Sequence, residues 1–325
     1  MTKTRIELLW DELARSHRSG SAPPGAFKLK MVDPESRFDL YAGTDDSGCL
    51  MLAAGMGRAP PMIRLDSTAL DYFRQERADG RWLMVLRLRE GTLAPVFGKL
   101  CQDLIDSAAT VADEPSLIAL IRERLLLWRK LFERGNSGLL EPFQIKGLIA
   151  ELLVLESLIA DEHRPPLEAV TAWVGPSGSD QDFLFSGDAI EVKAVGPDAE
   201  GVSISSLQQL DCSAPLQLRV QTMRSASASE ANAVGLNMLT LRLEGILSTA
   251  PEALLLFRGK LLEAGYVENP FYDTVLFELT KAERFQVTPD FPKLTCKSVP
   301  PGVVSAAYVV ALNCVRNLAE VHGDG

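Results

Sequence analysis

Histidine is scarce in this chain of 325 residues, which has three, His17, His163 and His322. All three lie in polar or terminal stretches, which leaves little basis for a Ser-His-Asp hydrolase or a histidine-rich metal site. The five cysteines are scattered, without the short spacing of a structural zinc site. Since no signal peptide precedes them, we expect reduced thiols and a cytoplasmic location.

The sequence also lacks a long apolar run and an excess of positive charge. The stretch from Ala250 to Phe257 comes nearest to a membrane span, but it is short and flanked by charge, so we expect no membrane segment. The 33 Lys and Arg residues are outnumbered by 43 Asp and Glu, which gives a net charge of −10. Such a surface opposes broad binding to nucleic acid, so a nucleic-acid enzyme of this composition would need a local basic patch or a DNA-binding partner.

What remains is an ordinary globular composition, with 46% hydrophobic and 23% charged residues. The length is enough for two domains. Gly135-Asn-Ser-Gly138 interrupts a helical pattern, so we place a boundary there. We expect residues 1–138 to form a sheet-and-helix portion for recognition or assembly, and 139–325 to form a second portion that carries the chemistry.

Hydrophobic periodicity predicts an α+β fold. In the first portion it predicts helices at 3–16, 95–109 and 115–134, and an antiparallel sheet with strands at 38–42, 49–54, 62–65, 70–73 and 82–88. In the second portion it predicts helices at 142–161, 230–247 and 251–264, and strands at 168–174, 216–223, 273–280 and 302–311.

The stretch 179–195 has the most informative pattern. Its apolar runs at 183–185 and 189–195 flank Ser186-Gly187-Asp188, which predicts two strands joined by a tight turn. We expect a two-residue loop at 187 and 188, which sets the register of the hairpin.

In that register Asp182 lies opposite Lys193, and Glu191 is two residues from Lys193 on one strand. Residues two apart share a face, so two carboxylates and an ammonium are expected to converge. If the first strand begins sooner, Asp180 has the same parity and substitutes for Asp182. The opposite face is apolar and suits a core, with Phe183, Phe185, Ile190, Val192 and Ala194.

Carboxylate oxygens bind hard cations such as Mg²⁺, which polarise a phosphate and lower the pKa of a bound water, so this trio suits metal-assisted hydrolysis of a phosphodiester. The residues resemble the PD-(D/E)XK nuclease superfamily, with Asp182 and Glu191 as the acids and Lys193 as the lysine. Gln181 stands where the motif's name has Pro, and the gap between the acids is short. An ordinary cross-strand ion pair on an exposed strand is the alternative interpretation of Glu191 and Lys193.

The predicted helix 142–161 supplies a further candidate acid. In many PD-(D/E)XK enzymes the helix before the hairpin contributes an acidic residue to the metal cluster, and Gly147-Leu-Ile-Ala-Glu151 looks like that element. Glu156 competes with Glu151 but lies on another face of the helix. The alternative is that Glu151 is a solvated flank beside a leucine stripe.

Candidate nucleic-acid contacts are less specific. Arg122, Arg129 and Lys130 are interleaved with apolar residues of a predicted helix and suit either a phosphate-binding ridge or a solvated face. Gln208 follows the hairpin, where an amide can contact a phosphate or a base edge, although polar surface is the simpler interpretation.

The resemblance implies a restriction-endonuclease-like core in 139–325, a mixed sheet with the central hairpin flanked by helices. It also implies a DNA endonuclease that uses Mg²⁺ or Mn²⁺, as one subunit of a multi-component restriction or phage-defence system with an ATPase or helicase-like partner. Two alternatives stay open. One is an inactive protein of this fold that binds nucleic acid or assembles a complex, and the other is a structural protein whose ion pair is incidental.

Overall fold

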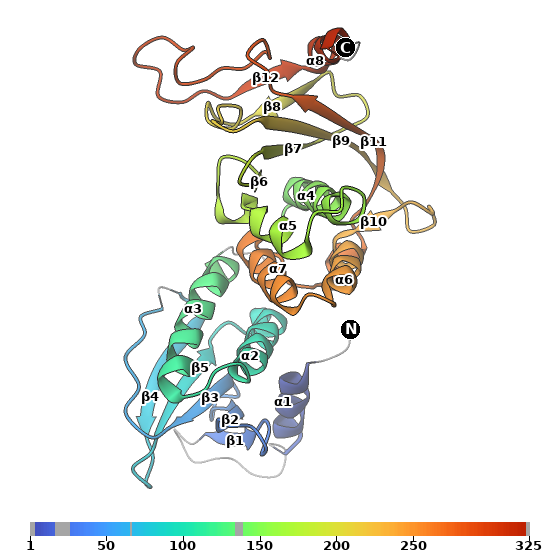
Figure 1. The fold of residues 1–325 in the computed structure, drawn as a ribbon. Helices are drawn as coiled ribbons and strands as arrows, with labels where there is room; N and C mark the ends of the chain where they lie inside the picture. Colours follow the sequence, from blue (N-terminus) through green and yellow to red (C-terminus); the bar gives the residue numbers. More distant parts are fainter. Residues whose placement is uncertain (1–3, 17–26, 66, 134–138, 323–325) are drawn as a thin grey trace. The chain divides into compact units, whose positions relative to one another are not determined.

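The computed structural model describes residues 4–16, 27–65, 67–133 and 139–322, with the backbone alone at 16, 129–133 and 319–322. The chain forms two compact units, Met1–Leu139 and Leu140–Gly325. The α+β class expected from the periodicity is confirmed, since both units combine helices with sheets (Figure 1).

The first unit is an antiparallel five-stranded sheet covered by helices. The strand order is β1 (Lys28–Met31), β2 (Leu40–Thr44), β3 (Leu50–Met56), β5 (Trp82–Leu88) and β4 (Leu70–Glu76). The helices are α1 (Arg5–Ser16), α2 (Ala94–Ala108) and α3 (Glu114–Glu133). The segment 62–65 is not a strand, and the strand β1 was not predicted, because four residues of mixed polarity give no clear alternation.

The second unit is built on a mixed sheet. Its order is β10 (Val234–Gly235), β11 (Leu276–Gln286), β9 (Leu216–Ala226), β7 (Ala189–Val195) and β6 (Phe183–Leu184). Strands β7 and β9 are parallel, and the other pairs are antiparallel. A two-stranded sheet joins β8 (Gly201–Ile204) to β12 (Tyr308–Ala311), and α8 (Leu312–His322) follows directly.

Strand β7 is covered on both faces. Helix α4 (Pro142–Ala160) packs against it, with α5 (Pro166–Ala172), α6 (Leu236–Leu247) and α7 (Pro251–Ala264) packed beyond α4 (Figure 1). On the other face, Ala189 and Val195 join a core with side chains of β8, β9, β12 and α8. Because both faces are covered, the first four residues of β7 are buried and Lys193 is only partly exposed.

Several predicted elements of this unit were wrong in kind or extent. The segment 168–174 is not a strand, because Pro166 opens the helix α5, which ends at Ala172. The residue after that helix, Trp173, forms an isolated bridge with Phe183. The strand predicted at 302–311 is limited to β12, and the helix predicted at 230–247 begins only after β10.

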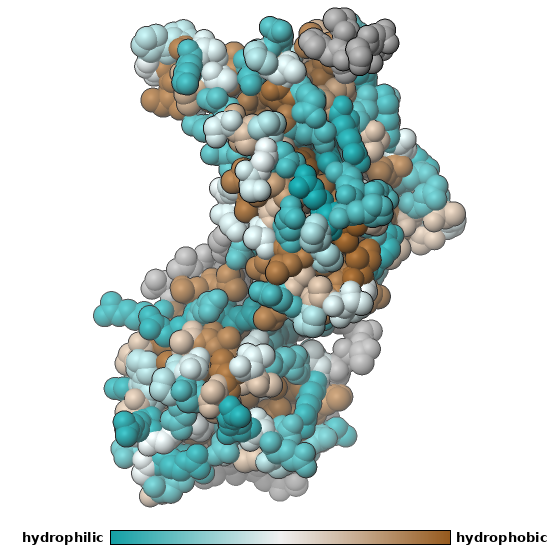
Figure 2. Space-filling view, viewed as in Figure 1, coloured by the Kyte–Doolittle hydropathy of each residue, from teal (hydrophilic) through white to brown (hydrophobic). Residues whose placement is uncertain are grey.

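Exposed apolar side chains gather on α6 and α7, where Met238, Leu241 and Leu255 are exposed (Figure 2). Within the part of the chain that the structure describes, every helix is too short or too polar to cross a lipid bilayer.

Candidate functional site

The hairpin of β6 and β7 has a longer loop than the sequence predicted. Phe183 pairs with Ile190 and Leu184 with Ala189, so four residues connect the strands, and Phe185 N donates to Asp188 O at 2.8 Å. The predicted two-residue loop was therefore wrong. The register is shifted by two residues, and because side chains alternate with a period of two, each one keeps its predicted face. The residue that would lie opposite Asp182 in this register is Glu191, and not Lys193 as predicted.

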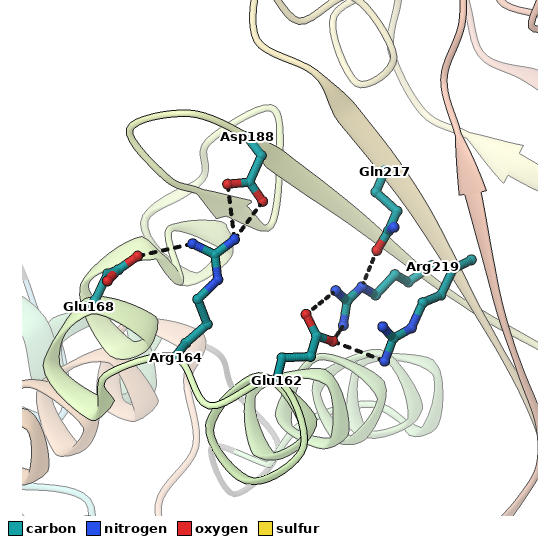
Figure 3. A network of polar contacts seen from close by, with 7 residues as sticks. Glu162, Arg164, Glu168, Asp188, Gln217 and Arg219 are labelled. Atoms are coloured by element: carbon teal, nitrogen blue, oxygen red, sulfur yellow. Dashed lines mark hydrogen bonds and ion pairs between the residues drawn. The ribbon is translucent and has the colours of Figure 1, made fainter.

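Two ion-pair clusters tie the hairpin and its neighbouring strand to the segment after α4 (Figure 3). Arg164 donates to both carboxylate oxygens of Asp188 at 3.1 Å and lies 4.4 Å from the centre of the Phe185 ring. In the second cluster, Arg219 of β9 contacts Glu162 at 2.8 Å. The loop of the hairpin and the strand β9 are thus both fixed relative to α4.

Asp182 extends the hydrogen bonding of the hairpin just before β6 begins. Its Oδ2 accepts a hydrogen bond of 2.7 Å from Val192 N, a backbone donor of β7 beyond the two residues that β6 pairs. Its backbone oxygen accepts hydrogen bonds from Val174 N at 2.8 Å and Gly175 N at 3.0 Å. Burial raises the pKa of Asp182 to about 6, against the opposing effects of the Val192 N–H and the Lys193 charge.

Glu191 and Lys193 form an ion pair beside Asp182. Lys193 Nζ lies 2.8 Å from Glu191 Oε1, and its side chain is 16% exposed. Glu191 is 1% exposed, and its Oε2 has no hydrogen-bond partner among the described residues. Burial, and next the charge of Asp182, raise the pKa of Glu191 to about 8. An ion pair on an exposed strand would not have these properties, because water would screen both charges.

Glu151 reaches the same place from α4. Its Oε2 accepts a hydrogen bond of 2.7 Å from Trp173 Nε1, and the Trp173 ring packs against Phe257 of α7. Burial, and then the charge of Asp182, raise the pKa of Glu151 well above its usual value. The competing acid Glu156 points elsewhere, because Arg242 of α6 binds it at 2.5 Å and 2.7 Å.

Two of these carboxylates approach the backbone at Gly175. A Cβ atom on Gly175 would lie 2.9 Å from Asp182 Oδ1 and 3.0 Å from Glu151 Oε2. Both distances are shorter than carbon and oxygen normally approach, so a side chain at this position would press on the acids. The two oxygens therefore lie on either side of the point that a Cβ of residue 175 would occupy.

These acids have the donor types that a hard cation requires. Carboxylate oxygens are preferred ligands of Mg²⁺, and the unpartnered Oε2 of Glu191 and the approach of two carboxylates at Gly175 both fit an added ion. The side chains of the described residues do not yet form a group of three or more acidic, histidine or cysteine ligands at metal-binding distances. Binding would therefore require a small rotation of at least one carboxylate. The attraction between the cation and the carboxylates would offset the energetic cost of that rotation.

The remaining predicted residues are not brought to this cluster by any described contact. Arg122 is exposed on α3 in the first unit, and the side chains of Arg129 and Lys130 lie outside the described part of the chain. Asp180 is exposed, and its charge is a minor contribution to the raised pKa of Glu191. Their roles, and those of the four central residues, stay predictions.

Sequence reasoning missed two residues that contact the cluster. Trp173 was placed in a strand, and its indole N–H was not recognised as a donor to Glu151. Of the neighbouring glutamines, Gln208 reaches Cys296 Sγ at 3.8 Å, whereas Gln209 binds Lys193. The spacing of two adjacent amides carries no signal that distinguishes them.

Comparison with known proteins places the chain in a family. A family model described as "Putative PD-(D/E)XK family member, (DUF4420)" matches residues 6–313, which is nearly the whole chain. A search of curated proteins and a search of solved structures each find no match.

Proposed function

The chain belongs to this PD-(D/E)XK family, and we propose that it is a metal-dependent endonuclease that hydrolyses DNA phosphodiesters. The observation that carries the proposal is the meeting of Asp182, Glu191 and Glu151 around one lysine at the edge of β7. Three buried carboxylates with raised pKa values are costly for a fold to retain, and perturbed groups of this kind concentrate at functional sites. The restriction-endonuclease-like core is part of the same proposal, supported by the helix α4, the hairpin and the mixed sheet.

The three carboxylates would hold the cation. When bound, Mg²⁺ or Mn²⁺ would polarise the phosphate and lower the pKa of a bound water. Because Glu191 and Asp182 have raised pKa values of about 8 and about 6, they must release protons before they bind an ion. Affinity for the metal should therefore increase as the pH rises.

Lys193 would act on the other side of the reaction. Its ammonium carries three donors and no acceptor, so it can orient an attacking water or offset the negative charge that builds on the phosphate. It is held between Glu191 Oε1 and Gln209 Oε1, at 2.8 Å and 3.1 Å. A donor already fixed in this way needs little reorganisation during the reaction.

The chain's net charge of −10 bears on how it meets DNA. Repulsion between an acidic surface and the phosphate backbone slows association and weakens binding. We therefore propose that the chain acts as one subunit of a restriction or phage-defence system, in which a partner such as an ATPase or a helicase-like protein engages the DNA.

The test is cleavage of DNA by the chain reconstituted with the products of neighbouring genes, in Mg²⁺ or Mn²⁺. Wild type is compared with Lys193→Ala and Asp182→Ala, and we expect either substitution to reduce the rate by orders of magnitude, because each removes transition-state stabilisation worth several kcal/mol. The control is Lys281→Ala, which removes a lysine that pairs with Glu283 on β11.

Equal cutting by wild type and Lys193→Ala would assign the activity to a partner and leave this hairpin as a scaffold. A complex that binds DNA and Mg²⁺ but never cuts would support the inactive alternative. Thermal unfolding with and without Mg²⁺ separates that alternative from a purely structural protein, which should show no metal-dependent shift.

A further inference from the structure

The side chain of Gln209 joins Lys193 to the loop that follows β8. Its Oε1 accepts one hydrogen bond from Lys193 Nζ at 3.1 Å and another from Ser205 N at 2.8 Å. Both partners are donors with no acceptor capacity, so the oxygen of the amide, and not its nitrogen, must face them. The orientation of this amide is therefore set by its chemistry.

The amide of Gln181 holds the same loop from the hairpin. Gln181 is 8% exposed, and its Nε2 donates to the backbone oxygens of Gln208 at 2.9 Å and Gln209 at 3.3 Å. It directly precedes Asp182, at the position where the name of the motif has proline. A proline has no side-chain donor and could make neither bond.

The loop 205–210 is held at several points. Leu207 and Leu210 are fully buried and anchor it to the core. Within the loop, Gln209 N donates to Ser206 Oγ at 3.3 Å, and Asp211 N donates to Gln208 O at 3.0 Å. A backbone held at this many points presents the Gln209 side chain in one place.

Lys193 needs such a contact because its long side chain has many rotamers and loses this freedom when its ammonium is held in one place. Its other contact is Glu191, 2.8 Å away. A cation bound by Glu191 would compete for that carboxylate's charge, which weakens its hold on the lysine. The Gln209 oxygen is uncharged and already accepts hydrogen bonds from Lys193 Nζ and Ser205 N, so its contact with the ammonium would persist.

We propose that Gln209 is a positioning residue for Lys193, and that Gln181 sets Gln209 by holding the loop 205–210. The catalytic meaning of this relay rests on the proposed function, since it matters for cleavage only if Lys193 acts on a phosphate. The contacts themselves require neither metal nor DNA, so they can be tested separately from the activity.

The test uses the full chain in metal-free buffer, with two measurements by mass spectrometry: hydrogen exchange of the loop 205–210 and the acylation rate of Lys193. Gln209→Met removes the acceptor at nearly constant volume, and Gln209→Glu restores an acceptor oxygen. Gln181→Met loosens the loop while leaving Gln209 in place. The matched control is Gln208→Met, whose side chain contacts Cys296 Sγ and not the lysine.

We expect Gln209→Met to speed exchange of the Ser205 amide about fivefold, as the loss of one hydrogen bond of about 1 kcal/mol predicts. Lys193 should be acylated several-fold faster in the same variant. Gln181→Met should raise both rates, whereas Gln209→Glu and Gln208→Met should match wild type in both. Exchange of the β7 peptide, unchanged throughout, would show that the variants remain folded.

An unchanged acylation rate in Gln209→Met would overturn the proposal, and so would equal behaviour of Gln209→Glu and Gln209→Met. In the reconstituted complex, Gln209→Met should lower kcat about tenfold with KM little changed, as expected when a catalytic group is misplaced and not lost. If the wild-type complex does not cut, the proposed function fails, while the exchange and acylation results still decide whether Gln209 positions Lys193.

Discussion

Replacing Glu191 by glutamine should stabilise the metal-free protein in mild base, although it breaks an ion pair. The pKa of this carboxyl rises from its usual 4.5 to about 8, chiefly through burial. Between these values the folded state keeps a proton that the unfolded chain has released. The contribution of Glu191 to the free energy of unfolding is therefore fully present below about pH 4.5 and is lost as the pH rises through about 8.

The magnitude follows from the same shift. Each pKa unit is worth about 1.4 kcal/mol, so ionising this site costs the folded protein on the order of 5 kcal/mol by about pH 9. Glu191→Gln is neutral at every pH and has nearly the shape of the protonated acid. We expect it to match wild type within about 1 kcal/mol near pH 5 and to exceed it by a few kcal/mol near pH 9.

The assay is urea unfolding in EDTA across this pH range, followed by hydrogen exchange in peptides of β7 and β9. Glu283→Gln is the control of opposite sign, because the hydrogen bond from Arg316 lowers the pKa of Glu283 to about 2. That carboxylate stabilises the fold above its usual pKa of 4.5, so its loss should lower stability in mild base. A Glu191→Gln protein less stable than wild type near pH 9 would refute the reasoning, as would parallel pH profiles of the two.

Three further results are expected. Mg²⁺ should raise the unfolding temperature of wild type more near pH 8 than near pH 6, because the acids must lose protons to bind it, and EDTA should reverse the effect; equal shifts at both pH values would count against these ligands. Trp173→Phe keeps the aromatic packing but removes the donor to Glu151, so calorimetry should show Mg²⁺ affinity reduced about tenfold. Arg164→Met removes the bonds to Asp188, and the unfolding free energy should fall by about 1 kcal/mol, with faster exchange in the hairpin loop.

The hairpin could be predicted because strand periodicity tolerates an error of two residues. The loop was expected to hold two residues and holds four, yet Asp182, Glu191 and Lys193 keep the face that the alternation assigns. The helix α4 was predicted nearly to its ends, because its apolar stripe is long and periodic. The family resemblance drawn from these residues is confirmed by the match over 6–313.

The contacts around the acids could not be predicted, because they come from segments whose local pattern is ambiguous. The stretch 168–174 has the apolar content of a strand, and only tertiary packing makes it a helix that delivers Trp173 to Glu151. Positions 208 and 209 are both glutamine, so the sequence does not distinguish them. Which partner each side chain reaches depends on the conformation of the loop between Leu207 and Leu210. The burial of Glu191 likewise depends on elements far along the chain, because residues of β8, β12 and α8 form the core that covers β7 on one face.

The approach of two carboxylates at Gly175 has a consequence for how relatives of this protein are interpreted. A single methyl group there would meet Asp182 Oδ1 at 2.9 Å and Glu151 Oε2 at 3.0 Å. A homologue with alanine at this position could keep every acid and the lysine and still have two of those acids pushed out of place. The ability of such proteins to bind a metal would then depend on residue 175, which lies outside the motif. A survey of the family should therefore record this glycine alongside the motif.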